Sequence, residues 1–310
     1  MAQVVLVHGI AQEQESADSL ERDWVPDLAG GVREAGCAQV ADRLLGRHST
    51  DQPIEVRMAF FGGLFRDQGE EIQGSTNVEM SVEDEVAEAL AREWLANLAE
   101  RSGDPGERRG AEDSLALVRS TPEDEQGAGE IARRAISFLG QRRYFAPLGF
   151  DLAQRLGNRA LGQVSAYLGD DRVRQDALAR VAGLIDDRTT VIVGHSLGSV
   201  VAYEAAWQLA RPLALLITLG SPLGLETIVY DNVRPRPPGF PPQVVRWVNV
   251  ADREDMIAAE PDLRRLFPAP PGRLPIEGVL IDNGAKPHSA ASYLTSTSVG
   301  RPIGEALAAA

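Results

Sequence analysis

The sequence predicts an α/β fold, in which helices flank a mostly parallel sheet. Short apolar segments rich in β-branched residues alternate with amphipathic segments, and the alternation begins within the first part of the chain. Hydrophobic residues make up 44% of the 310 positions, which is enough for a large core. We therefore expect one α/β domain spanning residues 1–310, interrupted at residues 63–169 by a helical cap or lid insertion.

Two strands and a helix are predicted before the insertion. The apolar run Gln3–His8 is followed by a glycine and predicts the first strand. Trp24–Ala35 predicts a helix, with Pro26 in the first turn, where a missing backbone N–H is tolerated. Pro53–Phe60 alternates apolar and polar residues before a pair of glycines, which predicts the second strand.

The segment 63–169 contains no strand pattern and is predicted to be helical. Ser81-Val82-Glu83-Asp84 is a capping box, and apolar residues follow it at i+4 spacing as far as Leu98. Three further helices are expected at about 111–119, 130–139 and 150–168. Arg101–Gly110 and Thr121–Gly129 are charged and contain Pro or Gly, so we expect loops there.

The α/β alternation resumes after residue 169. An amphipathic helix is predicted at Asp171–Ile185, another from Leu197 to near Arg211, and a C-terminal helix around Ile303–Ala309. Four more apolar runs predict strands, and these lie at Thr189–Val193, Leu213–Leu219, Val244–Val250 and Ile276–Ile281.

A G-x-S-x-G pentapeptide, Gly194–Gly198, lies between a predicted strand and a predicted helix. In a strand–turn–helix of this type the serine occupies a strained turn, which directs its hydroxyl away from the backbone. The two glycines suit the turn because a Cβ atom there would crowd the neighbouring strands. We therefore identify Ser196 as a candidate nucleophile.

A serine hydroxyl needs a nearby base, and the chain has four histidines. His195 is expected to point away from the serine, His8 ends a strand where a packed structural role is expected, and His48 lies too early in the chain. His288 follows the last predicted strand, where the base falls in the chain order Ser, acid, His. His288 is therefore the predicted base.

The acid that orients the base is expected in the loop after the strand Val244–Val250. Asp255 and Asp252 are both candidates there, and Glu254 is a third choice. Asp255 is preferred because Met256-Ile257 follows it, and an apolar pair often follows this acid. Asp252 would then brace the loop.

Backbone N–H groups are needed at such a site to stabilise an oxyanion. The predicted donors are the N–H groups of Leu197, directly after the serine, and of Ile10, in the turn after the first strand. Ser221 lies in a Gly-Ser-Pro sequence without the pentapeptide and is expected to shape the pocket wall. The sequence has no phosphate-binding loop and no histidine pair at metal spacing, so we predict neither a cofactor nor a metal.

The net charge of −14 argues against nucleic acid or an anionic membrane surface as a main partner. Cys37 is the only cysteine, which excludes an intrachain disulfide. No apolar run approaches the ~20 residues needed to cross a bilayer, and no secretory signal is recognised. We therefore expect a cytoplasmic protein without an integral membrane segment.

Four of these segments together resemble the α/β-hydrolase superfamily: Val7–Ile10, Gly194–Ser199, Leu219–Gly224 and Trp247–Asp255. They look like the lipase and esterase branch that includes GPI-inositol-deacylase-like lipases. More closely, the chain resembles actinobacterial hydrolases, some of them labelled serine peptidases. The resemblance covers roughly residues 1–62 and 170–300, and the insertion matches no family motif.

The resemblance implies a triad of Ser196, Asp255 and His288, with Ile10 and Leu197 as oxyanion donors. It also implies a shortened, mostly parallel sheet of about six strands, because the chain begins at what would be the third strand of the full α/β-hydrolase fold. The expected activity is hydrolysis of a carboxylic ester of moderate to long acyl chain through an acyl-enzyme. Hydrolysis of thioesters, amides or peptides, and acyl transfer, are alternatives, and a non-catalytic binding protein is an alternative of another class.

Overall fold

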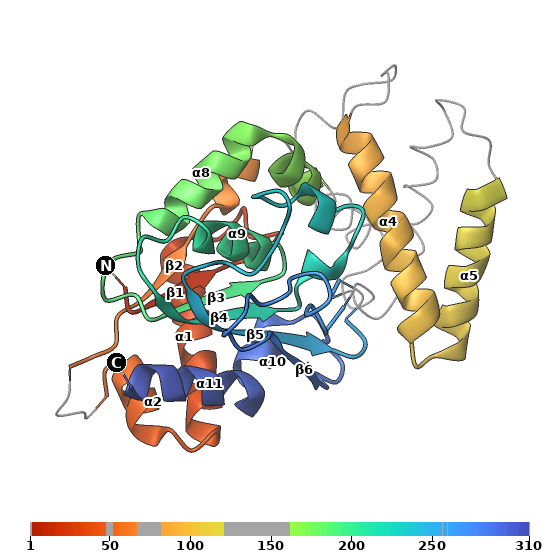
Figure 1. Cartoon of the computed structure of the whole chain (residues 1–310). Coiled ribbons are helices and arrows are strands. Elements are labelled where there is room, and N and C mark those ends of the chain that lie inside the picture. The colour runs from red at the N-terminus through yellow and green to blue at the C-terminus, as the bar shows by residue number, and fades with distance from the viewer. Residues whose placement is uncertain are drawn as a thin grey trace.

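Six parallel strands form one open sheet at the centre of the molecule (Figure 1). The structure is a computed structural model and describes residues 2–47, 52–66, 82–120, 162–255, 257–258 and 260–309. The strand order is β2-β1-β3-β4-β5-β6. The strands are β1 (Val4–Val7), β2 (Val56–Ala59), β3 (Val191–His195), β4 (Leu213–Leu219), β5 (Val244–Asp252) and β6 (Glu277–Ile281).

The central strands are built largely from Val, Ile and Leu because both faces of the sheet are covered. Every residue of β1 and β3 is buried. The strands pair in a regular register, in which Val4 of β1 lies opposite Val56 of β2 and Val191 of β3. The predicted α/β class is therefore confirmed, and the sheet is parallel throughout.

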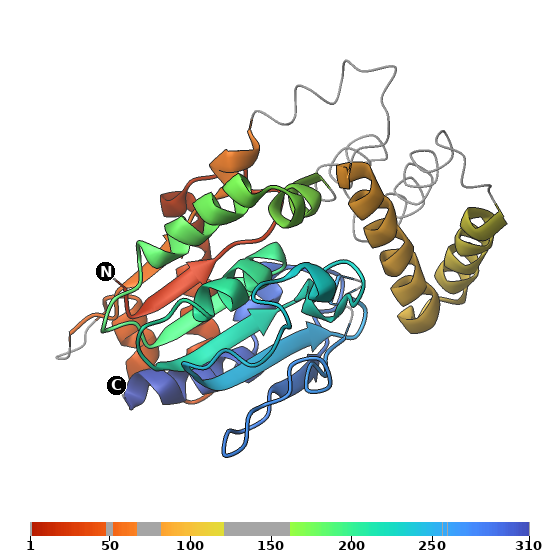
Figure 2. The ribbon, with the colours of Figure 1, turned by 45° about the horizontal axis from the view of Figure 1, so that its top comes forward.

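Helices cover both faces of the sheet (Figures 1 and 2). On one face lie α1 (Ala17–Glu34), α2 (Ala38–Leu44), α10 (Ala290–Leu294) and α11 (Thr297–Ala308). On the other lie α8 (Asp171–Ala182), α9 (Leu197–Ala206) and a helix at 162–169. The side chains of β1 alternate between the two cores, since Val4 and Leu6 face α1 whereas Val5 and Val7 face α9.

The chain leaves two neighbouring strands toward opposite faces of the sheet. After β1 it forms α1 on one face, and after β3 it forms α9 on the other. β1 and β3 are hydrogen-bonded neighbours, so the topological switch point of the sheet lies between their carboxyl ends, the position at which open α/β sheets bind ligands. The turns that begin at His8 and at Ser196 meet at this position.

The described part of the segment 63–169 is helical. It comprises η1 (Gly62–Phe65), α4 (Val82–Arg101), α5 (Pro105–Ser120) and the helix at 162–169. α4 and α5 lie side by side next to the sheet (Figure 2), and Glu93 of α4 accepts hydrogen bonds from the backbone and hydroxyl of Thr227, which follows β4. None of the helices in the described ranges is both long and apolar enough to cross a membrane.

Several predictions for this segment fall on residues that the structure does not describe. These are the capping residue Ser81, the loop Thr121–Gly129, the helix at 130–139 and most of the helix at 150–168. The loop predicted at Arg101–Gly110 is wrong beyond Asp104, because α5 begins at Pro105. Proline suits the first helical position, and Asp104 Oδ1 accepts the N–H groups of Gly106 and Glu107.

Other helix boundaries also differ from the prediction. α1 begins at Ala17 because Ser16 and Ser19 form a capping box, so Pro26 lies inside the helix. α9 ends at Ala206, because the residues that follow carry the chain back to the start of β4. α11 starts at Thr297 after the capping residue Ser296, and the short helix α2 was not predicted.

Candidate active site

Ser196 lies between β3, which ends at His195, and α9, which begins at Leu197. Its φ and ψ angles are 54° and −131°, a region that a residue with a side chain rarely occupies. Among the described residues, only Ser196 and Ala11 combine a side chain with a positive φ. The serine is therefore held in a strained turn at the carboxyl end of the sheet.

Three glycines let the backbone segments around this turn approach one another. A Cβ on Gly194 would lie 2.5 Å from the Gly198 carbonyl oxygen, and a Cβ on Gly198 would overlap the carbonyl oxygen of His8. A Cβ on Gly9 would lie 2.6 Å from Ser196 Cβ and 3.2 Å from its Oγ. The turn after β1 therefore packs directly against the serine side chain.

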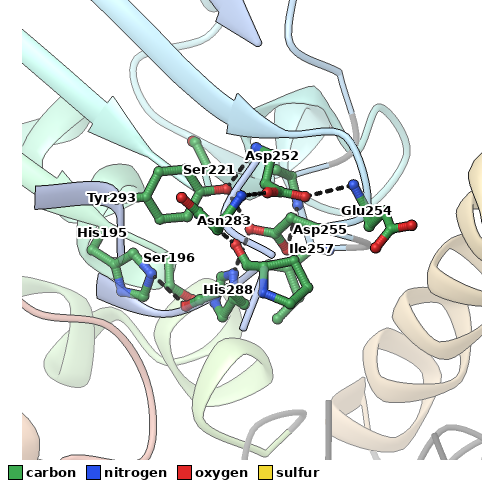
Figure 3. A network of polar contacts seen from close by, with 12 residues as sticks. His195, Ser196, Ser221, Asp252, Glu254, Asp255, Ile257, Asn283, His288 and Tyr293 are labelled. Atoms are coloured by element: carbon green, nitrogen blue, oxygen red, sulfur yellow. Dashed lines mark hydrogen bonds and ion pairs between the residues drawn. The ribbon is translucent and has the colours of Figure 1, made fainter. Parts of the chain in front are cut away.

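The partly buried His288 and the fully buried Asp255 form a hydrogen-bonded pair, with 2.7 Å between His288 Nδ1 and Asp255 Oδ2 (Figure 3). The other carboxylate oxygen, Oδ1, accepts the N–H groups of Ile257 at 3.0 Å and Ala258 at 3.4 Å. Burial by itself would raise the pKa of Asp255. The adjacent His288 and the hydrogen bonds from His288 and Tyr293 outweigh this effect, so the pKa of Asp255 is lowered. The carboxylate is thus ionised and held toward one imidazole nitrogen.

Asp252, the second choice for the acid, is also buried, but its carboxylate binds backbone groups. Oδ1 accepts the N–H of Glu254 at 2.7 Å, and Oδ2 accepts the N–H of Asn283. These bonds join the loop after β5 to the segment that leads from β6 to His288. The structure therefore brings Asp255 to the imidazole and leaves Asp252 in a bracing position, with Glu254 contributing its backbone N–H.

Tyr293 lies on α10, which follows His288 in the chain, and it is a site residue that sequence reasoning missed. Its hydroxyl donates to Asp255 Oδ2 at 2.7 Å and accepts the N–H of Asp252 at 2.8 Å. Burial and the charge of Asp255 raise the pKa of Tyr293, so the phenol remains protonated. No sequence pattern links this tyrosine to an acid 38 residues earlier.

His195 lies beside His288 and supports its backbone (Figure 3). His195 Nε2 is 3.0 Å from the His288 carbonyl oxygen, and the two ring centroids are 4.7 Å apart. Because a carbonyl oxygen only accepts, Nε2 carries the hydrogen. Burial and the proximity of His288 lower the pKa of His195 to about 3, so its ring is a neutral donor.

His8 is a second buried, neutral histidine, and it holds the turn after β1. Its Nε2 accepts the N–H groups of Phe61 at 3.0 Å and Gly62 at 3.2 Å, so the hydrogen is on Nδ1, which donates to the Gly9 carbonyl oxygen at 2.7 Å. Burial lowers the pKa of His8 to about 4. This is the packed environment expected for His8, whereas His48 lies outside the described residues.

The two predicted oxyanion donors belong to turns that meet at Ser196. Leu197 is the first residue of α9, so its N–H has no intrahelical acceptor. The N–H of Ile10, which follows the glycine packed on Ser196, donates to no described residue. The positive end of the α9 dipole favours negative charge at the same place.

One nitrogen of His288, the predicted base, is left unpaired. His288 Nε2 is buried and has no hydrogen-bond partner within the part of the chain that the structure describes, Ser196 Oγ included. Hydrogen bonds between a nucleophile and its base are often long until substrate is bound. Because Nδ1 on the other side of the imidazole is paired with Asp255, Nε2 is the atom able to exchange a proton.

Ser221 supports the turn at Ser196 through Ser199. It is buried, its hydroxyl lies 2.7 Å from that of Ser199, and it accepts the N–H of Leu223, the second residue of η3 (Pro222–Gly224). Ser199 in turn donates to the Ser196 carbonyl oxygen at 2.6 Å. Ser221 is thus engaged in structural hydrogen bonds.

No family model, curated protein or solved structure matches this chain. Among the residues described, no group of three or more His, Cys, Asp or Glu side chains could hold a metal ion. A strained serine, an imidazole with one unpaired nitrogen, an ionised partner acid and two available N–H groups are suited to nucleophilic attack on a carbonyl carbon.

Proposed function

We propose that this protein is a serine hydrolase with an α/β-hydrolase fold, and that it cleaves carboxylic esters through an acyl-enzyme. The observation that carries the proposal is the Asp255–His288 pair, with 2.7 Å between Oδ2 and Nδ1, beside a serine whose φ is 54°. A strained serine by itself is compatible with a purely structural turn, and an Asp–His pair by itself is compatible with a structural ion pair. Their meeting at the switch point of the sheet favours covalent catalysis.

The proposed reaction assigns one role to each residue. Ser196 Oγ attacks the ester carbonyl carbon while His288 Nε2 takes the hydroxyl proton. The oxyanion of the tetrahedral intermediate is stabilised by the N–H groups of Leu197 and Ile10. His288 then gives the proton to the leaving alcohol, and Asp255 keeps the imidazole oriented and stabilises its cationic form.

A water molecule completes the cycle by the same steps. His288 Nε2 removes a proton from the water, whose oxygen attacks the acyl carbon of the acyl-enzyme. The second tetrahedral intermediate uses the same N–H donors, and its collapse releases the acid and returns the proton to Ser196 Oγ. No other group is required to balance the reaction.

The order of the sheet supports the assignment of the fold. The proposed nucleophile follows β3, the acid follows β5 and the base follows β6, in the chain order Ser, Asp, His. The first strand in the sequence lies next to the strand of the nucleophile, which brings the Gly9–Ile10 turn to the serine. The same arrangement suits a thioester or an amide as well as an ester.

The predicted preference for esters of moderate to long acyl chain has little support from the described helices. Trp94, Leu95 and Leu98 of α4 are buried in the core cluster, so they are not available to line an acyl pocket. We propose esters as the substrate class because they are the least demanding acyl donors for this machinery. Acyl-chain profiling with p-nitrophenyl esters, together with a peptide panel, measures the preference.

A fluorophosphonate probe tests the proposal. Wild-type protein is expected to be labelled under native conditions and to hydrolyse a p-nitrophenyl ester, and Ser196→Ala is expected to lose both properties. Ser165→Ala is the matched control, because it removes another buried serine hydroxyl and leaves in place the nucleophile and the residues that support its turn. A wild-type protein that is neither labelled nor active toward esters, thioesters and amides would overturn the proposal and favour a binding protein.

A further inference from the structure

Hydrogen bonds hold both peptide groups that flank Ile10, the residue whose N–H is a predicted oxyanion donor. His8 Nδ1 donates to the Gly9 carbonyl oxygen at 2.7 Å, which fixes the plane of the Gly9–Ile10 peptide. In a trans peptide the N–H points opposite to the carbonyl, so this bond directs the Ile10 N–H. The next peptide plane, between Ile10 and Ala11, is held from a distant part of the chain.

Gln163, in the helix at 162–169, makes that second contact. Its Oε1 accepts the Ala11 N–H at 2.8 Å, and its Nε2 donates to Glu13 Oε2 at 3.0 Å. Both partners fix the orientation of the amide, because a backbone N–H only donates and a carboxylate only accepts. Gln163 is 5% exposed, so water competes little for these bonds.

The conformation that Gln163 holds is an unfavourable one. Ala11 has a φ of 60°, and it is the only described residue with a side chain, apart from Ser196, that has a positive φ. Such a conformation persists only where the surroundings over-determine it, and it is typical of functional sites. The turn is also crowded from η1, since a Cβ on Gly62 would lie 2.6 Å from the Gln12 carbonyl oxygen.

We propose that Gln163 is a positioning residue for the oxyanion hole: by binding the Ala11 N–H and Glu13, it fixes the turn that directs the Ile10 N–H toward the substrate oxygen. The inference rests on the proposed function, because it assigns a role within the same site. It also gives the end of the inserted segment a part in catalysis, since Gln163 and Ala11 are 152 residues apart. Gln163 itself touches no reacting atom.

Removal of the side-chain amide tests the proposal. In Gln163→Ala we expect kcat for a p-nitrophenyl ester to fall roughly 10- to 100-fold, because a misdirected donor loses part of its transition-state stabilisation. KM is expected to stay within about threefold, since the N–H acts mainly on the oxyanion. The rate of fluorophosphonate labelling should fall with kcat.

An exchange of the amide and the carboxylate separates positioning from folding. Gln163→Glu places a second carboxylate next to Glu13 and is expected to impair kcat. Adding Glu13→Gln to that variant restores a donor opposite an acceptor and leaves an oxygen for the Ala11 N–H, so kcat should recover most of the loss. Glu13→Gln alone measures the effect of the second substitution by itself. Ser165→Ala, which changes a buried serine of the same helix, is the control for a general disturbance of that helix.

The outcomes distinguish the inference from the function on which it rests. If wild type is neither labelled nor active, the proposed function fails. If wild type is active and folded Gln163→Ala retains its kcat, or if the exchange variant recovers nothing while its unfolding midpoint equals that of wild type, the role of Gln163 is refuted. Unfolding midpoints by circular dichroism accompany every variant.

Discussion

Tyr293 and His288 bind the same oxygen of Asp255. The Tyr293 hydroxyl and His288 Nδ1 each lie 2.7 Å from Oδ2, while Oδ1 faces backbone N–H groups. The carboxylate is therefore saturated with donors and cannot rotate without breaking several hydrogen bonds. Its negative charge is shared between the imidazole and the phenol, so Tyr293 helps to fix the carboxylate oxygen that orients His288.

We expect Tyr293→Phe to lower kcat, because Asp255 Oδ2 loses one of its two side-chain donors and the carboxylate then orients the His288 imidazole less firmly. The loss of a hydrogen bond to a buried charge should also cost about 1.5–3 kcal/mol of unfolding free energy. Urea unfolding and steady-state kinetics measure the two effects.

Tyr203→Phe is the matched control for that variant. The Tyr203 hydroxyl is hydrogen-bonded to the backbone of Gly239 at 3.0 Å and lies outside the site. Tyr203→Phe is expected to lose stability without any change in kcat. A kcat that falls equally in both variants would show that Tyr293 does not act through Asp255.

Asp255→Asn and Asp252→Asn are expected to differ widely in kcat. An amide at position 255 orients the imidazole wrongly and cannot stabilise its cation, so a loss of about 10⁴-fold is expected by analogy with other triads. Asp252 accepts backbone N–H groups of Glu254 and Asn283, so an amide there should mainly lower stability. Steady-state kinetics measure kcat for both variants. Comparable losses of kcat in the two would contradict the assignment of Asp255 as the acid.

Gly220→Ala is expected to inactivate the protein. A Cβ on Gly220 would lie 2.8 Å from Asp255 Oδ2 and 3.1 Å from His288 Nδ1, and so would force the pair apart. Gly272→Ala is the control, because Gly272 also has a positive φ, of 83°, but has open space around its Cβ position. Both variants should lose stability from the backbone conformation, at about 1 kcal/mol. Only Gly220→Ala should lose ester turnover, and activity that survives in it would contradict the close packing at the pair.

The buried neutral histidines predict a loss of stability in mild acid. His8 and His195 have folded-state pKa values of about 4 and about 3, compared with about 6.5 in an unfolded chain. Below about pH 6.5 the unfolded chain binds protons that the folded protein refuses, so the unfolding free energy falls as the pH falls from 6.5 toward 4. Each histidine contributes a slope of up to about 1.4 kcal/mol per pH unit.

His195→Gln checks this prediction. Glutamine does not titrate, and its Nε2 can still donate to the His288 carbonyl oxygen. The unfolding free energy should therefore depend less steeply on pH between about pH 4 and pH 6, by about 1.4 kcal/mol per unit. Urea unfolding at several pH values gives the slope, and a slope equal to that of wild type would mean that His195 is charged in the folded state.

Local patterns were sufficient for the sheet and for the serine turn. The apolar runs predicted all six strands, because a strand buried on both faces must be apolar along its whole length. The pentapeptide predicted the turn at Ser196, because only glycines tolerate the close contacts at positions 194 and 198. Capping residues such as Ser16 and Asp104 were overlooked, which explains the wrong starts of α1 and α5.

The choice among acids and the supporting residues depended on the tertiary structure. Asp252 ends β5 and Asp255 lies in the loop that follows, and their spacing does not tell which carboxylate reaches an imidazole contributed by a segment beyond β6. Tyr293, His195 and Gln163 could not be recognised, because each acts through a contact between segments distant in sequence.

The sequence by itself thus determined the α/β class, the strained position of Ser196 and the candidate histidine, since these follow from side-chain periodicity and backbone sterics over a few residues. Only the tertiary structure decided which carboxylate oxygen faces His288, which phenol shares it, and which amide holds the turn of Ile10. Hydrogen bonds act over about 3 Å, and the chain reaches such distances between remote residues only after the sheet and its helices have packed.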